Sequence, residues 1–547
     1  MDTKISTLVH ELFGVSPDVK LTRPDPQFGD YATNVALQLA KPLGKNPREI
    51  AEVIVGELKK NSIEASVAGP GFINIRLSDA LLLEQARTVQ QVGNAHIVSP
   101  VDGKTVVIET NNPNPFKAMH IGHAFNAVLA DTVANLLEAD GAHIYRVSYH
   151  GDVGLHVGKS MYSLLKYADG DISRLTAIPE PERNTFMSRM YADGSRAYKE
   201  DEAAKTEIDQ LAAQSFAPTS AIYAQIYDLC KSWSFQAIDG IVARLGNKPI
   251  SLRFLESDAD DRGVVIVKKN TPGVFKLSDG AYVFEGSKYG AFDNAFVASN
   301  GRGLYAARDL GLMVLKNEQF HPDKSYIVTA EEQRDYFKGV IAAAELCLPE
   351  LKGETVNIAT GTVKLTTGKM SSRDGDVVEI EWLFDQIAEA VKARGGEPTD
   401  AIIAGALRYQ FLKVKIGSDV VFDVSDAVSL TGNTGSYLQY AYARANSILR
   451  KSETEATSPA ELNDSERALV RKLTEYTDAS TLAMRELLPH HVCTYLYELA
   501  QEFNRFYEKN QVIGSDREAE RLWMVARYAD TLKRGLAVLG IEAPERM

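Results

Sequence analysis

His120 and His123, separated by Ile121 and Gly122, form the group with the clearest capacity for chemistry in this chain, and Lys117 lies just before them. Imidazole and ammonium groups donate hydrogen bonds to a phosphoryl group that gains charge in a transition state. Gly122 lets a base or a ribose approach the backbone closely. The pattern therefore predicts a phosphate site, although a pair of surface or core histidines, or half of a metal site, would look the same.

A second group of residues suited to phosphate lies in a glycine-flanked loop much further along the chain. It consists of Lys369, Met370, Ser371, Ser372 and Arg373, which supply two cations and two hydroxyls. These donors suit a phosphate clamp, and a solvated hairpin is the alternative. The two groups together indicate phosphate chemistry more specifically than either does alone.

The first group lies in a stretch that predicts a strand, a loop, a helix and a second strand. The strands are expected at 105–109 and 144–149, and the loop at 111–115 is rich in asparagine and proline, which stop both helix and sheet. From His123 apolar residues recur at helical spacing as far as Gly141, a C-terminal cap. Such a unit builds a parallel sheet whose ligands bind beyond the carboxyl ends of the strands. The loop is therefore the expected site, and the helix N-terminus after it attracts phosphate.

The residues before this unit, 1–98, predict a small α+β domain. Helices are expected at 1–14, 31–43 and 47–60. A strand-like segment, GPGFINIRL, begins at a turn and closes the domain. Its expected buried residues are Phe72, Ile73, Ile75 and Leu77.

The residues after it divide into a sheet-forming part, 99–385, and a helical part, 386–547. The first part contains a polar and mostly helical stretch at about 150–260, which we interpret as an insertion. Strands are expected again at 263–269, 273–277, 281–286 and 325–330, and a helix is expected at 336–347. Amphipathic helical patterns dominate the second part.

The composition is that of a globular protein of several domains with an acidic balance. Its 547 residues suffice for about three or four domains. The net charge of -13 argues against a protein that coats nucleic acid non-specifically, since such proteins carry a basic surplus. Specific RNA binding is compatible with this charge, because basic patches can lie on an acidic whole.

The cysteines and the N-terminal stretch bear on the cellular compartment. Cys230, Cys347 and Cys493 are far apart and match no disulfide or metal-ligand spacing, which favours a reducing compartment and predicts the cytoplasm. The opening MDTKISTLVHELFGV lacks the long apolar core and the cleavage site of a signal peptide. No apolar run is long enough to span a bilayer, so neither secretion nor membrane insertion is expected.

The two phosphate motifs resemble the signatures of class I aminoacyl-tRNA synthetases, and the chain as a whole resembles the arginyl-tRNA synthetases. Residues 120–123 match the HIGH motif of that class, and 369–373 match a variant of its KMSKS loop. FGDYATNVALQLAK and GPGFINIRLS are similar to the family's N-terminal domain, which contacts the tRNA elbow. GNTGSYLQYAYARANSIL, LYELAQEFNRFYEKNQVIG and LGIEAPERM are similar to its helical anticodon-binding domain.

The resemblance implies a fold, a reaction and a set of partners. The fold is α/β, with a Rossmann-like parallel-sheet catalytic domain over 99–385, a small α+β N-terminal domain over 1–98 and an all-α anticodon-binding domain over 386–547. The reaction is ATP-dependent ligation of L-arginine to tRNA(Arg) through an arginyl-adenylate, with release of AMP and pyrophosphate, and activation would need bound tRNA. Mg²⁺ would arrive on the ATP phosphates, and no structural zinc, DNA or membrane is expected. The enzyme would act as a monomer in the cytoplasm.

The resemblance also assigns roles in binding arginine and ATP. Catalysis falls to His120, His123, Lys117, Lys369 and Ser371, and ATP binding falls to His120, Gly122, His123, Lys369, Met370, Ser372 and Arg373. Arginine binding falls to Glu109, Asn114, Tyr305, Asp309 and Gln333. Carboxylates and a phenol suit a planar guanidinium that has five donors, and an amide can accept from the α-amino group.

Contacts with tRNA are the third implied role. They fall to Asn74 in the N-terminal strand and to Tyr437, Gln439, Tyr440 and Arg444 in the helical part. Aromatic faces and a cation are the usual means of holding unpaired bases, although aromatic residues at helical spacing also occur in cores.

Four positions depart from the family pattern. Ser372 replaces the second lysine of KMSKS, which removes a cation from the triphosphate site, and Lys117 is expected to compensate. Phe125 stands where many relatives carry a basic residue, and Val153 and His156 replace a tryptophan and a glutamine. A contact at each of these positions would therefore differ from that in relatives.

Two other functions fit parts of the same pattern. One is a different class I synthetase, such as a cysteinyl or lysyl enzyme, but a cysteine-specific site needs a zinc cluster that three scattered cysteines do not build. The other is a non-catalytic paralogue that binds tRNA or senses arginine, which would have no need of both phosphate motifs. Arginine-dependent charging of tRNA separates the three functions.

Overall fold

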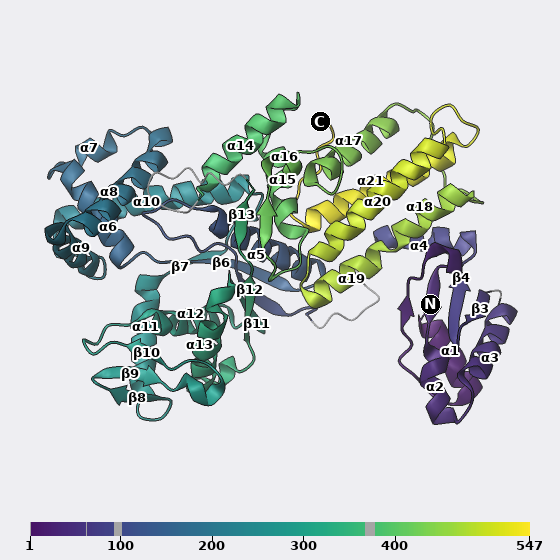
Figure 1. The fold of residues 1–547 in the computed structure, drawn as a ribbon, viewed down its shortest axis with the longest axis horizontal. Coiled ribbons are helices and arrows are strands. Elements are labelled where there is room, and N and C mark those ends of the chain that lie inside the picture. Colours follow the sequence, from purple (N-terminus) through teal and green to yellow (C-terminus); the bar gives the residue numbers. More distant parts are fainter. Residues whose placement is uncertain (1, 62, 92–100, 367–377) are drawn as a thin grey trace. The chain divides into compact units, whose positions relative to one another are not determined.

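The computed structural model describes residues 2–61, 63–91, 101–366 and 378–547, which divide into two compact units (Figure 1). The smaller unit combines 1–93, 444–479 and 495–532, and the larger unit combines 94–443, 480–494 and 533–547. The larger unit contains both histidines of the first motif, so it positions the candidate site.

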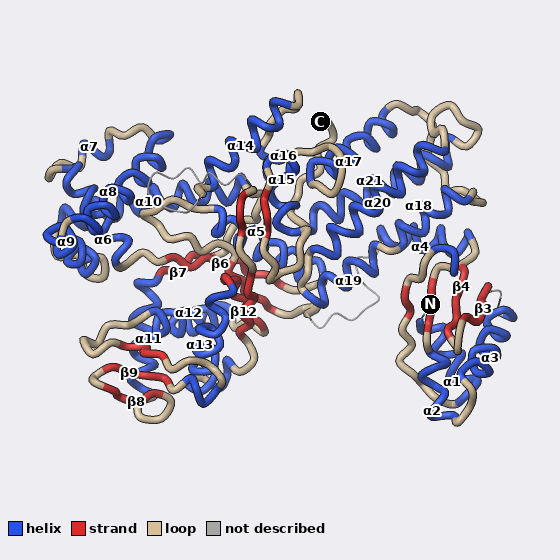
Figure 2. Tube along the Cα trace, viewed as in Figure 1, coloured by secondary structure: helices blue, strands red, loops and turns tan. Residues whose placement is uncertain are grey.

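A five-stranded parallel sheet lies in the larger unit (Figure 2). Its order is β12 (Thr355–Thr360), β11 (Lys324–Ala330), β5 (Thr105–Glu109), β6 (His143–His150) and β7 (Leu252–Leu255). Every neighbouring pair of strands is parallel. The chain adds β6 and β7 on one side of β5, and β11 and β12 on the other. This reversal leaves a crevice at the carboxyl ends of β5 and β11, which is where such sheets bind ligands.

Helix α5 (Ile121–Ala139) connects β5 to β6, which confirms the predicted strand, loop, helix and strand. Val133 and Leu137 lie one turn apart on the helix and pack in one apolar cluster with Val106 and Ile108 of β5. His120 is the N-cap residue of α5. The helix N-terminus therefore points the histidine motif towards the carboxyl end of the sheet.

A helical insertion separates β6 from β7, as predicted for 150–260 except that β7 itself belongs to the sheet. Its helices are α6 (Leu155–Ala168), α7 (Ser173–Thr176), α8 (Arg183–Glu200), α9 (Glu202–Gln214) and α10 (Ala221–Arg244). They enclose an apolar core of their own, which includes Met161, Ile208 and Trp233.

Two closely packed helices follow β7, namely α11 (Glu256–Lys269) and α12 (Tyr305–Phe320). A Cβ atom at Gly263 would lie 1.8 Å from the carbonyl oxygen of Ala307, and one at Gly311 would lie 2.0 Å from that of Ala259. The strand predicted at 263–269 is wrong, since this run of valine and isoleucine belongs to α11. The tight packing against α12 outweighs the β propensity of these residues.

The remaining elements of this half agree in part with the predicted strands and helix. Strands β8 (Phe275–Ser278), β9 (Ala281–Phe284) and β10 (Asn294–Val297) form an antiparallel sheet, and α13 (Arg334–Cys347) follows β11. A short parallel pair joins β13 (Val363–Leu365) to β14 (Val420–Phe422), with α14 (Ile380–Ala393), α15 (Asp400–Leu412) and α16 (Val424–Ala427) around it. Strands β8, β9 and β11 and helix α13 agree with the predictions for this half, whereas β10, β12 and β13 were not predicted.

A buried arginine joins α15 to α5. The guanidinium of Arg408 donates to the Asp131 carboxylate (3.0 Å), the Asn247 side chain (2.6 Å) and the Leu539 carbonyl oxygen (2.9 Å). Arg146 of β6 donates to the same aspartate (3.2 Å). Both arginines and the aspartate are buried, so this polar centre fixes the packing of α5 in the larger unit.

The smaller unit begins with the predicted α+β domain. Its antiparallel sheet has the order β1 (Leu21–Thr22), β2 (Tyr31–Thr33), β4 (Phe72–Arg76) and β3 (Glu64–Ala68), and its helices are α1 (Asp2–Phe13), α2 (Val35–Leu43), α3 (Pro47–Lys60) and α4 (Asp79–Gln91).

Two predictions for this domain are wrong. Residues 31–33 form β2 rather than the start of a helix, because they pair with β4. Phe72 is 43% exposed, whereas Ile73 and Ile75 are buried. Side chains alternate along a strand, so Phe72 shares the outer face of β4 with Asn74.

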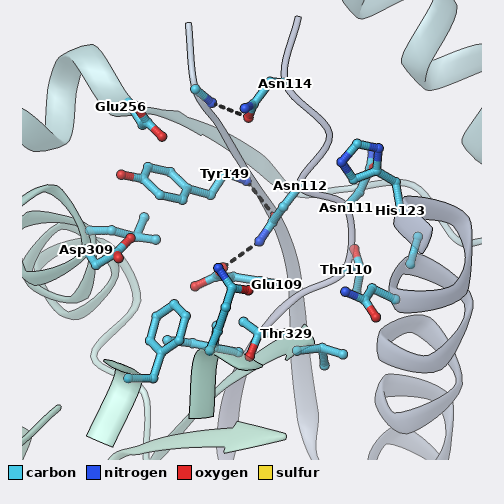
Figure 3. Close-up of a pocket in the computed structure, with 18 of the residues that line it drawn as sticks. Glu109, Thr110, Asn111, Asn112, Asn114, His123, Tyr149, Glu256, Asp309 and Thr329 are labelled. Carbon is cyan, nitrogen blue, oxygen red and sulfur yellow. Dashed lines mark hydrogen bonds between the residues drawn. The ribbon is translucent and has the colours of Figure 1, made fainter. Parts of the chain in front are cut away.

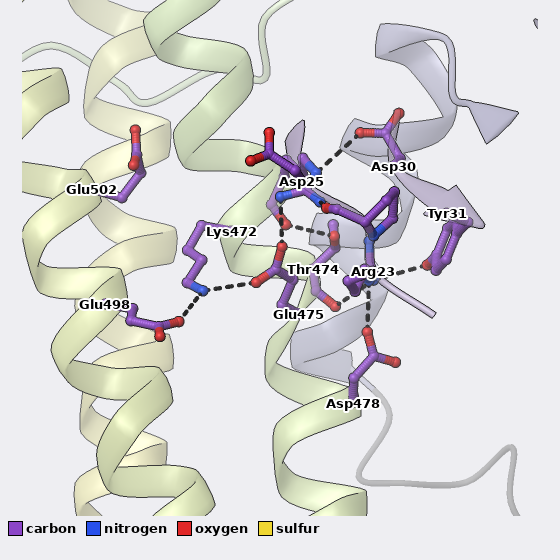
Figure 4. A network of polar contacts seen from close by, with 12 residues as sticks. Arg23, Asp25, Asp30, Tyr31, Lys472, Thr474, Glu475, Asp478, Glu498 and Glu502 are labelled. Atoms are coloured by element: carbon purple, nitrogen blue, oxygen red, sulfur yellow. Dashed lines mark hydrogen bonds and ion pairs between the residues drawn. The ribbon is translucent and has the colours of Figure 1, made fainter. Parts of the chain in front are cut away.

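The last helices of the chain are α17 (Gly435–Arg450), α18 (Asp464–Thr474), α19 (Tyr476–Glu486), α20 (His490–Lys509) and α21 (Glu518–Val538). In the smaller unit a network of polar contacts joins the N-terminal domain to α18 and α19 (Figure 4). Arg23 donates to Asp478 (2.7 Å), and Lys472 pairs with Glu475 (2.8 Å) and Glu498 (2.6 Å). Across the residues that the structure describes, no helix has the length and apolarity needed to cross a membrane.

Candidate active site

A cavity of about 480 Å³ opens at the carboxyl ends of β5 and β11, where the strand order reverses (Figure 3). Segment 109–114, the end of β6 and the helices α5, α11, α12 and α13 contribute to its walls. All five residues predicted to hold an amino acid line it, namely Glu109, Asn114, Tyr305, Asp309 and Gln333. The fold therefore brings these five residues together from three separate parts of the sequence.

The loop after β5 is fixed by two asparagine side chains. The Oδ1 atom of Asn112 accepts from the backbone N–H of Tyr149, and the Oδ1 atom of Asn114 accepts from that of Gly151, each at 2.9 Å. Figure 3 shows both contacts. Because its oxygen binds the backbone, Asn114 can present its amide N–H groups to a ligand in the cavity.

Glu109, the last residue of β5, is paired before any ligand arrives. Lys316 of α12 donates to its Oε1 atom (2.7 Å), and Asn112 donates to its Oε2 atom (2.7 Å). The side chains of Glu109 and Lys316 are almost completely buried. The negative charge of Glu109 is therefore already compensated by an ammonium group.

Asp309 of α12 is the acid of the cavity that lacks a cationic partner among the described residues. Its Oδ2 atom accepts a hydrogen bond from the Tyr336 hydroxyl at 2.5 Å. The pKa of Asp309 is raised to about 7, mainly by burial and also by the nearby Glu256 and Glu109, while the Tyr336 hydrogen bond and the Lys316 charge act in the opposite direction. A cationic ligand would supply the charge that this carboxylate lacks.

Glu256 and Tyr149 also line the cavity, and the sequence reasoning missed both. Arg308 donates to Glu256 (2.9 Å) and to Asp260 (2.9 Å), so this second acid is paired like Glu109. The Tyr149 side chain extends towards Glu256 and Asp309 (Figure 3), and its pKa is raised well above the usual range by burial and by these acids. Tyr149 and Glu256 stand at the carboxyl ends of β6 and β7, a position that would have identified them once the strand order was known.

The histidine motif borders a second cavity of about 610 Å³, next to the first. His123, Asn126 and Gln333 line both cavities, and His120 and Gly122 line the second. A ligand in one cavity can therefore meet a ligand in the other at these shared residues.

The two imidazole rings stack with their centroids 3.5 Å apart. His120 accepts from the backbone N–H of His123 at the start of α5. Burial and then the Lys117 charge lower the pKa of His120 to about 4. Burial, His120 and Lys117 lower the pKa of His123 to about 2. Both rings are consequently neutral at physiological pH, and each can donate one hydrogen bond.

Lys117 is a half-buried cation near the histidine pair. Burial lowers its pKa, and its charge in turn lowers the pKa values of both histidines. In the part of the chain that the structure describes, its ammonium group makes no hydrogen bond or ion pair. Lys117 lines neither cavity, but its charge acts on His120 and His123, which line the second cavity, and would also act on an anion bound beside them.

Several other predicted residues have defined positions. Tyr305 is 70% exposed and begins α12 at the cavity wall. Phe125 is buried against Phe411, so this position makes an apolar contact. Val153 is buried, and His156 binds the Gly151 carbonyl oxygen (2.7 Å).

The loop predicted to clamp phosphate falls outside the described residues. It comprises Lys369, Met370, Ser371, Ser372 and Arg373. The strand that precedes it, β13, carries Lys364, which lines the second cavity and pairs with Asp419 (3.1 Å). Nothing in the local sequence distinguishes Lys364 from a surface lysine, and the sequence reasoning missed it.

The residues predicted to contact tRNA differ in their exposure. Asn74 lies on the outer face of β4, Tyr440 is 40% exposed, and Arg444 is exposed and lies over the Tyr507 ring (4.7 Å). Tyr437 is half-buried. Gln439 is fully buried and donates to the carbonyl oxygens of residues 401 and 542, which argues against its predicted contact with tRNA.

Three family models match successive parts of the chain. The arginyl tRNA synthetase N terminal domain matches residues 1–77, the catalytic domain of tRNA synthetases class I (R) matches 87–421, and the DALR anticodon binding domain matches 438–547. Together the three models account for most of the sequence.

Curated relatives and solved structures agree over the full length. An arginine–tRNA ligase of Colwellia psychrerythraea is 31% identical and aligns with 98% of this chain and 96% of its own. One of Thermobifida fusca is 30% identical, over 100% and 98% of the two chains. The structure of Thermus thermophilus arginyl-tRNA synthetase has the same fold, with a TM-score of 0.80 at 24% identity over 100% of this chain and 99% of that one.

Proposed function

We propose roles for the two cavities on the premise that this chain belongs to the arginyl-tRNA synthetases. It is a ligase that joins L-arginine to tRNA(Arg) with ATP, through an arginyl-adenylate, and releases AMP and pyrophosphate. In this proposal the first cavity holds arginine and the second holds ATP. The residues shared by both cavities support it, because the arginine carboxylate must meet the α-phosphate of ATP.

The observation that carries the proposal is the environment of Asp309. Glu109 and Glu256 have basic partners, whereas Asp309 receives only the Tyr336 hydroxyl among the described residues. A guanidinium has five donors and a positive charge, so it matches this carboxylate in both charge and geometry. Asp309 would therefore hold the substrate side chain, and Glu109 would add a hydrogen-bond acceptor beside it.

Three further residues of the first cavity would hold the rest of the amino acid. Asn114 presents amide donors and would bind the substrate carboxylate, since its oxygen is occupied by Gly151. Gln333 lies where the two cavities meet and would accept from the α-amino group. Tyr305 would cover the mouth with its exposed ring.

The second cavity would position ATP for in-line attack on its α-phosphate. His120 and His123 are neutral donors, Gly122 gives the base or ribose access to the helix N-terminus, and Lys117 supplies charge. Lys369, Ser371 and the rest of their loop would complete the phosphate contacts. Little covalent chemistry is asked of such a site, so positioning and charge neutralisation carry the rate.

Magnesium would enter with the nucleotide in this proposal. Among the described residues, no group of histidine, cysteine, aspartate and glutamate side chains is arranged to hold a metal ion. Mg²⁺ commonly binds substrate phosphates with few protein ligands, and it would neutralise phosphate charge in the second cavity. The protein residues would then orient the phosphates around it.

The tRNA would bind through the domains at the two ends of the chain. The proposed domains are 1–98 at the elbow, 99–385 for catalysis and 386–547 at the anticodon, in keeping with the three family models. Tyr437, Tyr440 and Arg444 recur at helical spacing along α17 and would contact unpaired bases, and Asn74 would contact the elbow. Both cavities are lined by one chain, so a monomer suffices, and we place it in the cytoplasm.

Charging of purified tRNA tests this assignment. With active tRNA, ATP and Mg²⁺, we expect aminoacylation that depends on arginine and on no other amino acid in a panel. Asp309→Asn should raise the KM for arginine by about 10- to 100-fold, because a charged hydrogen-bond partner is lost. Charging with cysteine or lysine, or the absence of charging, would contradict the assignment.

A further inference from the structure

Tyr336, which no motif singled out, lines the first cavity from the start of α13. Its hydroxyl donates its only proton to the Oδ2 atom of Asp309 at 2.5 Å, a short distance for a hydrogen bond to a carboxylate. The Oδ1 atom of Asp309 makes no hydrogen bond or ion pair with the described residues and remains available to a ligand. The Tyr336 hydroxyl therefore holds the Oδ2 atom of Asp309 and leaves the Oδ1 atom for a ligand.

Most of the groups around Asp309 favour its protonated form, and the Tyr336 hydroxyl opposes them. Burial, Glu256 of α11 and Glu109 of β5 all favour the protonated acid, which cannot form an ion pair with a cation. Lys316 of α12 favours the ionised acid, but its ammonium group is bonded to Glu109. Of the remaining groups, Arg308 is bonded to Glu256, and Tyr149 of β6 contributes no charge. The Tyr336 hydrogen bond thus opposes the protonation of Asp309 directly.

We propose that Tyr336 is a positioning residue for the known reaction, whose hydroxyl keeps Asp309 ionised and turned towards the guanidinium of the incoming arginine. This inference rests on the proposed function, in which the first cavity binds arginine. Tyr336 acts through Asp309 and needs no contact of its own with the substrate. Removal of the Tyr336 hydroxyl leaves Asp309 in place but raises the pH at which Asp309 ionises.

Tyr336→Phe tests this role, because it removes one oxygen and keeps the ring. The KM for arginine in wild-type protein should fall as pH rises through about 7, where Asp309 ionises. In the variant we expect the midpoint of this profile to move upward by about one to two pH units, since a hydrogen bond to a charged group is lost. Near pH 9 the KM should return close to the wild-type value, and kcat at saturating arginine should change little.

A matched control is Tyr326→Phe, which removes a buried phenol of β11 that does not line the cavity. Its pH profile should coincide with that of the wild type. A KM for Tyr336→Phe that is raised equally at every pH would show direct contact with arginine and would overturn the proposal. An unchanged profile would overturn it as well.

A binding measurement keeps the test independent of turnover and of folding defects. Isothermal titration of arginine at pH 7, in two buffers of different ionisation enthalpy, gives the number of protons released on binding. The wild type should release about half a proton, and Tyr336→Phe should release more, because more Asp309 is protonated beforehand.

The Asp309→Asn variant separates this inference from the proposed function. An unchanged arginine KM in that variant would refute arginine binding by the first cavity altogether. A raised, pH-independent KM in Asp309→Asn, combined with no shift in Tyr336→Phe, would refute the role of Tyr336 alone.

Discussion

Replacing Lys117 by alanine should slow the formation of arginyl-adenylate without weakening the binding of arginine. The ammonium group is half-buried beside the histidine pair and has no ion pair among the described residues. The resemblance to the KMSKS motif implies that Ser372 replaces a lysine, which would leave the triphosphate with one cation fewer. Lys364 lines the second cavity but is paired with Asp419, so we expect the unpaired Lys117 beside the histidines to meet the phosphate charge that develops as pyrophosphate leaves.

The size of the effect follows from the contact that would be lost. A hydrogen bond to a charged group contributes about 1.5–3 kcal/mol, which corresponds to about a 10- to 100-fold change in rate. This loss should fall on kcat for arginine-dependent exchange between ATP and pyrophosphate, measured with tRNA present. The KM for arginine should remain near its wild-type value, because Lys117 does not line the first cavity.

Two controls sharpen this experiment. Lys159→Ala removes another lysine whose pKa is lowered by burial, but on α6 and away from both cavities, and it should leave exchange unchanged. In Lys117→Ala the pKa values of His120 and His123 should rise, because the Lys117 charge lowers both, and nuclear magnetic resonance of the imidazoles would record this. Unchanged exchange together with a lower unfolding temperature would mean that Lys117 is structural.

Three further outcomes are expected. Lys316→Met should destabilise the larger unit by about 3–5 kcal/mol, since it leaves Glu109 buried without its cation, and adding Glu109→Gln should restore part of the unfolding temperature in calorimetry. The exchange rate between pH 6 and 8 should show no inflection from the titration of His120 or His123, because the pKa values of both lie well below this range. An inflection in this range that disappears in His120→Asn would show that the rings are not neutral. Exchange between ATP and pyrophosphate should require tRNA, and a full rate without tRNA would refute that expectation.

Local patterns in the sequence were sufficient for the unit that carries the site. The apolar residues of α5 recur at helical spacing and β5 is a short β-branched run, so both elements follow from neighbours in the chain. The helix of residues 263–269 could not be recognised in this way. Its stability depends on the close approach of Gly263 to Ala307, a contact between distant residues. Similarly, β2 forms because β4 lies beside it.

In the candidate site too, some features follow from local sequence and others depend on contacts between residues distant in the chain. The motif around His120 and the resemblance to a family led to all five proposed arginine ligands, which line one cavity. Neither source indicated that Lys316 neutralises Glu109, because the two residues are 207 positions apart and meet only in the folded chain. Which acid is left for the substrate therefore depends on pairings that only the structure shows.

The buried polar centre around Arg408 affects when this chain can complete its folding during translation. Asp131 lies in the helix that begins at the histidine motif, and its partner Arg408 also donates to the carbonyl oxygen of Leu539. The ribosome adds Leu539 long after α5 has emerged. Until then a buried guanidinium lacks one of its acceptors, which disfavours the final packing of α5. The helix that begins at the histidine motif would thus acquire its complete set of contacts late in translation.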